Sequence, residues 1–167
     1  LAFRQTLGLA VQVHEQIVVG RAVGQQVLVQ ALVERSVLGH AGYSLAGGLR
    51  TGAVAMCIGG KGYVGTGGMA DWWEYDPAND TWTQKADFGG IVRGRAVGSS
   101  MGTKGYIGTG NGDVNPLYDF WEWDQKTDVW TQKANFEGIA RYGAVGFSIG
   151  NKGYIGSGYG NGTTLCK

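Results

Sequence analysis

The sequence WTQKADF at residues 82–88 returns 48 positions later as WTQKANF at 130–136, with a single substitution. A second string, KGYVGTG at 61–67, returns as KGYIGTG at 104–110 and as KGYIGSG at 152–158. The copies of this second string are 43 and 48 residues apart, which is the length of one supersecondary unit repeated in tandem. Such a repeat specifies the scaffold of a protein much more strongly than its function.

The composition excludes several classes of partner. The chain has 167 residues and a formal net charge of +1, so no electrostatic argument favours nucleic acid or an anionic membrane surface. No apolar run approaches the roughly 20 residues that span a bilayer, and no signal peptide is recognisable. Because the first residue is Leu1, we expect a processed or incomplete chain. Cys57 and Cys166 form no metal or redox spacing.

The chain divides near Gly47 into two unlike segments. Every tryptophan, lysine and aspartate follows that point. Residues 1–46 are rich in valine at alternate positions, which favours strands, although residues 27–38 also fit a helix. The repeat register fails here, since Gly39 would stand where Trp130 stands. Residues 1–46 are therefore either a different element or non-native peptide, and the missing residue types favour the second interpretation.

Aligned on Tyr63, Tyr106 and Tyr154, the repeats predict units of four short antiparallel strands. Turns rich in glycine and asparagine separate the strands, and the first strand of each unit is built from small residues. Units of this kind every 40–50 residues are typical of β-propeller blades, so the predicted class is all-β. The expected strands are 53–58, 96–101 and 144–149 (first), 62–66, 105–109 and 153–157 (second), 72–76 and 120–124 (third), and 81–85 and 129–133 (fourth).

Each complete unit ends its second strand with glycines and then places two aromatic residues separated by six others. In the first unit these are Tyr75 and Trp82, and in the second Trp123 and Trp130. In this pattern residues 47–167 resemble the kelch repeats of bacterial secreted proteins, although Trp123 replaces the usual tyrosine.

The resemblance implies a partial kelch β-propeller of about two and a half four-stranded blades. The blades are expected at 47–89, 90–137 and, incomplete, 138–167, while residues 1–46 stay unassigned. Closed propellers have about four to eight blades, so the remaining blades of a larger propeller are expected partners. The resemblance also implies an extracellular or cell-surface location.

The longer loops, which join the second strand to the third and the fourth to the next unit, are expected on one face. Arginines there can donate forked hydrogen bonds to a carboxylate or to sugar hydroxyls. An arginine column also recurs at Arg50, Arg93 and Arg141, and such recurrence favours a scaffold role in which each arginine ties its loop to the neighbouring blade. The candidate ligand-binding residues are Arg93, Arg95, Arg141, Asp113, Asn115 and Tyr118.

Catalytic and metal sites have weaker support. Glu74 with Asp76, and Glu122 with Asp124, invite an acid–base hypothesis, but their recurrence beside tight turns favours solvated strand ends. The loop 111–115 has oxygen ligands for calcium at alternate positions but lacks the downstream acidic residue of a full calcium loop, so an ordinary polar loop is favoured. Both histidines lie outside the repeat. We therefore expect no metal, no cofactor and no catalytic residue.

These observations favour a non-catalytic binding scaffold that recognises a protein or a glycan through propeller loops. One alternative is a fragment of a propeller enzyme resembling the sialic-acid mutarotases or galactose oxidase, although the copper site of the latter has no residue support here. Another alternative is a purely structural repeat segment of a surface protein.

Overall fold

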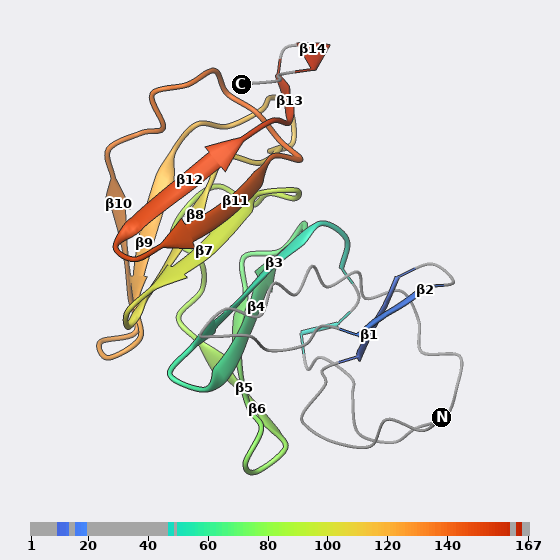
Figure 1. Ribbon diagram of the computed structural model, residues 1–167, viewed down its shortest axis with the longest axis vertical. Coiled ribbons are helices and arrows are strands. Elements are labelled where there is room, and N and C mark those ends of the chain that lie inside the picture. The colour runs from blue at the N-terminus through green and yellow to red at the C-terminus, as the bar shows by residue number, and fades with distance from the viewer. Residues whose placement is uncertain (1–9, 14–15, 20–46, 49, 161–162, 165–167) are drawn as a thin grey trace.

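The computed structural model describes residues 10–13, 16–19, 47–48, 50–160 and 163–164 (Figure 1). Every regular element in this part of the chain is a β-strand, and every pair of neighbouring strands is antiparallel. The predicted all-β class is confirmed. No helix among the described residues is long enough and apolar enough to cross a bilayer.

Two four-stranded sheets and one hairpin follow the repeat. The first sheet has the order β3 (Ala53–Ile58), β4 (Lys61–Thr66), β5 (Trp72–Asp76) and β6 (Thr81–Lys85). The second has the order β7 (Val97–Met101), β8 (Lys104–Gly108), β9 (Phe120–Asp124) and β10 (Val129–Lys133). The hairpin of β11 (Val145–Ile149) and β12 (Lys152–Gly156) is the inner half of a third unit. The smaller hairpins pair β1 (Ala10–Val13) with β2 (Gln16–Val19), and β13 (Tyr159–Gly160) with β14 (Thr163–Thr164).

The predicted strands match the observed ones to within one residue at each end. The second strands of the later units end at Gly108 and Gly156, one residue earlier than expected. The next residues, Thr109 and Ser157, adopt positive φ values of 59° and 63°. Thr66 has the same conformation, with φ of 58°, yet it still pairs with Ala53 at the end of β4, so a positive φ accompanies the end of the second strand in all three units without fixing its last residue.

The three units lie side by side through their first strands. β3 contacts β7, and β7 contacts β11. Backbone hydrogen bonds continue this arrangement just before those strands, from the Arg95 amide to the Gly52 carbonyl at 2.8 Å and from the Gly143 amide to the Arg95 carbonyl at 2.9 Å. The sheets therefore fan outward from a shared inner edge, as blades do (Figure 1).

Aromatic side chains fill the space between the first two blades. Tyr63 and Trp72 of the first blade and Trp123 of the second are fully buried. The ring centroids of Tyr63 and Trp123 lie 4.9 Å apart, and those of Trp72 and Trp130 lie 5.5 Å apart in an edge-to-face arrangement. Such pairs stabilise the interface beyond the burial of their apolar area.

One carboxylate links the outer parts of these blades. Both oxygens of Asp128, in the turn between β9 and β10, accept hydrogen bonds at 3.1 Å from the Ala86 amide just after β6. The indole of Trp123 donates to the same carboxylate at 3.0 Å. Among the described residues, Asp80, the counterpart of Asp128 in the first blade, accepts only an exposed hydrogen bond from the Tyr75 hydroxyl.

The boundary expected between residues 46 and 47 stays a prediction. Most of residues 1–46 lie outside the described part of the chain, and the β1–β2 hairpin is the part of that segment that is described.

Candidate functional site

The arginine column is buried inside the blades. Arg50, Arg93 and Arg141 are 3%, 1% and 6% exposed. Arg93 donates one hydrogen bond of 2.6 Å to each oxygen of Asp119, and another of 2.9 Å to the Thr109 carbonyl. Arg50 likewise donates one hydrogen bond to each oxygen of Asp71, at 2.7 and 2.8 Å. In both complete blades a guanidinium thus joins the loop before the first strand to the loop before the third.

These ion pairs shift the acidity of the carboxylates. Burial alone would raise the pKa of Asp119, but hydrogen bonds from Arg93 and from the Trp121 indole outweigh that effect and leave the pKa below its ordinary value. The pKa of Asp71 is lowered by the same balance, with Arg50 and Trp73 as donors. Asp71 and Asp119 are therefore held ionised, and their oxygens already accept hydrogen bonds from arginine and tryptophan side chains of the same blade.

The backbone of Arg93 also reaches the preceding blade, because its carbonyl accepts hydrogen bonds from the Gly67 and Gly68 amides at 2.9 and 3.1 Å. This geometry fits the scaffold role for the column. Ligand binding by Arg93 and Arg141 stays a prediction.

Arg95 is different, because its side chain is exposed and its backbone lies in the left-handed region with φ of 56°. The equivalent positions of the neighbouring units are Gly52 and Gly143, with φ of 65° and 61°. Glycine adopts this conformation at no steric cost, whereas an L-residue pays roughly 1–2 kcal/mol. Unfavourable backbone conformations of this kind concentrate at functional sites.

Two tyrosines accompany Arg95. Its guanidinium lies 5.8 Å from the centroid of the Tyr142 ring, and Tyr142 stacks on Tyr159 with centroids 5.8 Å apart. Within the described part of the chain the guanidinium makes no hydrogen bond or ion pair. We name Arg95, Tyr142 and Tyr159 the mouth cluster, since Arg95 and Tyr142 precede the inner strands β7 and β11 and Tyr159 follows β12.

The other predicted site residues lie on an exposed loop. Asp113, Asn115 and Tyr118 are all exposed, Tyr118 by 51%. The loop is closed by a hydrogen bond from the Gly112 amide to the Asn115 carbonyl at 3.1 Å. Among the described residues, no hydrogen bond or ion pair joins these three side chains to Arg95. Their ligand-binding role stays a prediction.

Tyr142 and Tyr159 were missed by the sequence analysis. The signal was present, because both tyrosines stand at positions of the repeat that hold Gly94 and Asn111 in the unit before. Aligning the units residue by residue would also have shown that Arg95 stands where the units before and after it have Gly52 and Gly143.

The paired carboxylates are not simply solvated strand ends, and that expectation was wrong for the glutamates. Glu122 accepts hydrogen bonds from Lys104 Nζ at 2.7 Å and from the Tyr106 hydroxyl at 2.8 Å. The hydrogen bond from Lys104 is the largest of the effects that lower the pKa of Glu122. Burial, followed by the bond to Glu122, raises the pKa of Tyr106 to about 12. These groups cross-brace adjacent strands. Among the described residues, no group of three His, Cys, Asp or Glu side chains could hold a metal ion.

Comparison with known proteins supports the fold. No family model matches the chain, and no curated protein sequence does either. The solved structure titled "Structure of YjhT" is similar, with a TM-score of 0.62 and 23% sequence identity. The match covers 65% of this chain and 34% of the YjhT chain, so the present chain spans about a third of that protein. The described blades thus have a propeller-type fold.

Proposed function

We propose that this chain is part of a kelch-type propeller that acts as a non-catalytic binding scaffold. The mouth cluster recognises an acidic or hydroxyl-rich group of a protein or glycan. An extracellular or cell-surface location belongs to the same proposal and rests only on the resemblance to bacterial secreted kelch repeats.

The observation that carries the proposal is the conformation of Arg95. A glycine at this position would be less strained, as Gly52 and Gly143 are, yet the chain places an exposed arginine there. Arg93 donates to Asp119, whereas the Arg95 guanidinium makes no hydrogen bond or ion pair with any residue that the structure describes. Of Arg50, Arg93, Arg95 and Arg141, Arg95 alone is exposed, and it alone has the strained backbone conformation.

The chemistry of the cluster suits a carboxylate attached to a flat or ring-shaped body. A planar guanidinium binds a carboxylate through two parallel hydrogen bonds. The neighbouring tyrosine rings offer stacking area to a sugar or a peptide side chain.

The proposal is tested by binding to an array of neutral glycans, acidic glycans and acidic peptides. The native protein is expected to bind members that carry a carboxylate, and Arg95→Gly should weaken that binding by about 10-fold or more, as expected for the loss of a charged hydrogen bond. Lys126→Ala, in the tight turn after β9, is the matched control and should bind normally. Undiminished binding by Arg95→Gly would overturn the proposal.

A further inference from the structure

Residues 79–81, Asn-Asp-Thr, match the acceptor pattern of N-linked glycosylation, which is asparagine, any residue except proline, and then serine or threonine. They stand in and directly after the turn between β5 and β6, which lies at the lower end of the molecule in Figure 1. Residues 161–163, Asn-Gly-Thr, match as well, but Asn161 lies outside the described residues. The first match can therefore be judged by its geometry.

The side chains of the pattern lie at the surface. Asn79, Asp80 and Thr81 are all exposed. Asn79 Nδ2 donates an exposed hydrogen bond of 3.1 Å to Asp76 Oδ2, and the Ala78 amide donates to the other oxygen of the same carboxylate at 2.9 Å. One aspartate thus closes the turn and holds the asparagine amide. Because β6 is the edge strand of its sheet, no further strand of that sheet covers the turn.

The turn between β9 and β10 in the second blade has the same shape. Asp80 and Asp128, which hold equivalent positions in the two turns, have φ of 54° and 58°. In each turn the last residue of the third strand is an aspartate that accepts a hydrogen bond of 2.9 Å from the amide two residues later. The surroundings of the second turn therefore show what the first turn can accommodate.

The second turn packs beside a neighbouring blade, because the side chain of Gln125 donates a hydrogen bond of 2.7 Å to a tyrosine hydroxyl of the first blade. Thr127 and Val129 of this turn hold the repeat positions of Asn79 and Thr81. Both are nevertheless exposed, Val129 by 52%. The positions of the acceptor pattern thus stay accessible when a blade packs beside the turn.

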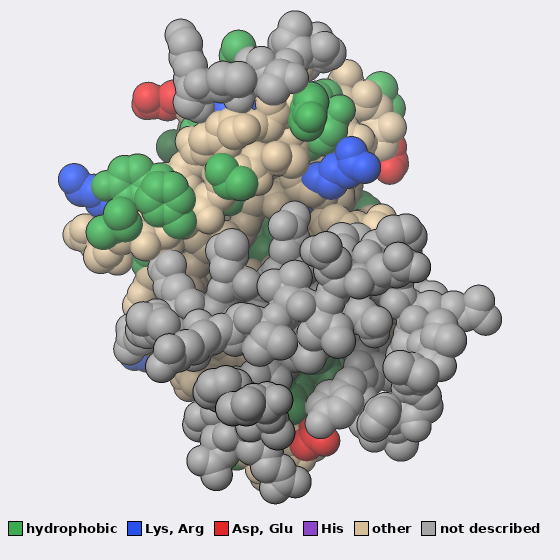
Figure 2. All heavy atoms as spheres, turned by 45° about the vertical axis from the view of Figure 1, so that its right-hand side comes forward, with side chains coloured by type: hydrophobic (Ala, Val, Ile, Leu, Met, Phe, Trp, Pro, Cys, Tyr) green, Lys and Arg blue, Asp and Glu red, His purple; other side chains and the backbone are tan. Residues whose placement is uncertain are grey.

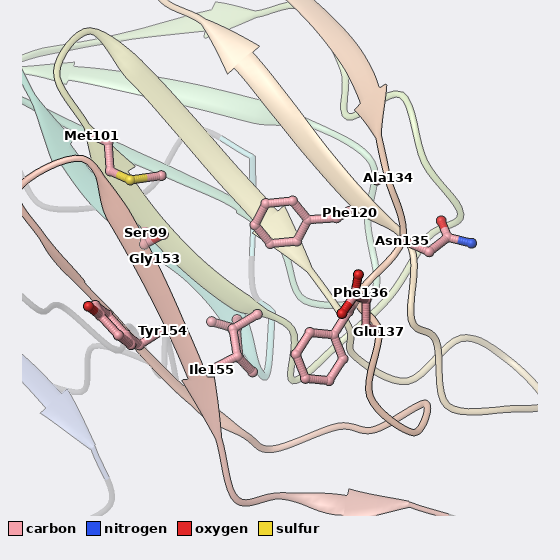
Figure 3. A pocket seen from close by; sticks show the side chains of 11 residues that line it. Ser99, Met101, Phe120, Ala134, Asn135, Phe136, Glu137, Gly153, Tyr154 and Ile155 are labelled. Carbon is pink, nitrogen blue, oxygen red and sulfur yellow. The ribbon is translucent and has the colours of Figure 1, made fainter.

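The turn is also separate from the hydrophobic surfaces. A groove of about 350 Å³ between the second blade and the β11–β12 hairpin is lined by Met101, Phe120 and Phe136, among others (Figure 3). Hydrophobic side chains are exposed in clusters on the described part of the surface (Figure 2). Residues 77–81 line no part of the groove and carry no large hydrophobic side chain. A bulky, hydrophilic group at this turn therefore leaves the packing surfaces free.

We propose that Asn79 is an acceptor for an N-linked glycan. The transfer forms a bond between Asn79 Nδ2 and the anomeric carbon of a sugar carried on a lipid pyrophosphate. The bond from that carbon to the pyrophosphate oxygen breaks, the pyrophosphate leaves with the electron pair, and a base of the transferase takes one proton from Nδ2. The amide keeps its second N–H, so the hydrogen bond to Asp76 can persist. This modification rests on the extracellular location proposed above and is independent of the mouth cluster.

The test is expression of the full chain behind a secretory signal peptide in a eukaryotic host. The tryptic peptide of residues 62–85 contains Asn79 and no other match, so its mass reports the occupancy of this site. We expect a glycan on this peptide, and its loss in Asn79→Gln and in Thr81→Val. The second variant is closely matched, because valine stands at the equivalent position of the second blade. Peptides are taken from secreted and retained protein alike, so poor secretion does not obscure the result.

A transplanted pattern tests the geometric argument. In the Asn79→Gln background, Thr127→Asn combined with Val129→Thr should bring a glycan to the tryptic peptide of residues 127–133. Carboxylate binding should be the same for the native chain and Asn79→Gln, so this proposal and the one for the mouth cluster can fail separately. An unmodified 62–85 peptide in the native chain, whatever is found at Asn161, would overturn the proposal, as would an unmodified transplant.

Discussion

Replacing Arg95 with glycine removes the guanidinium and the backbone strain together, so it separates binding from stability. The left-handed conformation costs an L-residue roughly 1–2 kcal/mol, while glycine costs roughly 0.5–1 kcal/mol through the entropy of the unfolded chain. The contact with Tyr142 at 5.8 Å contributes roughly 0.5–1 kcal/mol at an exposed site. Arg95→Gly should therefore stay within about 1 kcal/mol of the native free energy of unfolding.

Arg95→Ala keeps the strain and loses the contact with Tyr142. We expect it to be less stable than the native protein, and less stable than Arg95→Gly by roughly 0.5–1 kcal/mol. Urea denaturation followed by tryptophan fluorescence measures both differences, provided that the slopes of the transitions agree.

Gly143→Ala is the matched control at the equivalent position of the next unit. A Cβ there would meet only the Tyr159 ring, at 3.8 Å, so the substitution adds strain without a steric clash. It should cost roughly 1 kcal/mol. If Arg95→Ala proves as stable as Arg95→Gly, the position is not strained, and the argument for a selected arginine fails.

Three further outcomes are expected. Asp128→Asn should lose roughly 1–3 kcal/mol because it weakens the contact between the blades, whereas Asp80→Asn at the exposed equivalent should change little; equal losses in chemical denaturation would contradict this. The lowered pKa of Asp119 means that its pairing with Arg93 stabilises the fold fully above the ordinary carboxyl pKa, and that this contribution is lost as pH falls through the folded-state pKa. Asp119→Asn should remove that part of the acid dependence, measured as stability against pH, and an unchanged profile would refute it. Tyr106, with its pKa raised to about 12, contributes stability below its ordinary pKa that disappears as pH rises to the folded value; Tyr106→Phe should flatten this alkaline loss in denaturation measurements.

The repeat made the strands predictable from the sequence. Aligning Tyr63, Tyr106 and Tyr154 sets the register of the hairpins from β3 to β12, because side chains alternate with period two. The errors are shifts of one residue at strand ends: β8, for example, runs from Lys104 to Gly108 where 105–109 was expected.

The candidate site was less predictable, because its contacts join residues at unequal spacing. Arg50 and Asp71 are 21 residues apart, and Arg93 and Asp119 are 26 apart, since the intervening loop differs in length. A fixed repeat spacing therefore could not pair them. Without those pairs, the sequence did not show that Arg50 and Arg93 each bind an aspartate.

The central claim is that the mouth cluster binds an acidic group through Arg95. The most direct test is an NMR titration of the chain with glucuronate, with glucose as the neutral control. We expect saturable shifts at Arg95, Tyr142 and Tyr159 with glucuronate alone, and their loss in Arg95→Gly. Shifts confined to the tight turns at 59–62 and 102–105, or an identical response in the variant, would contradict the claim.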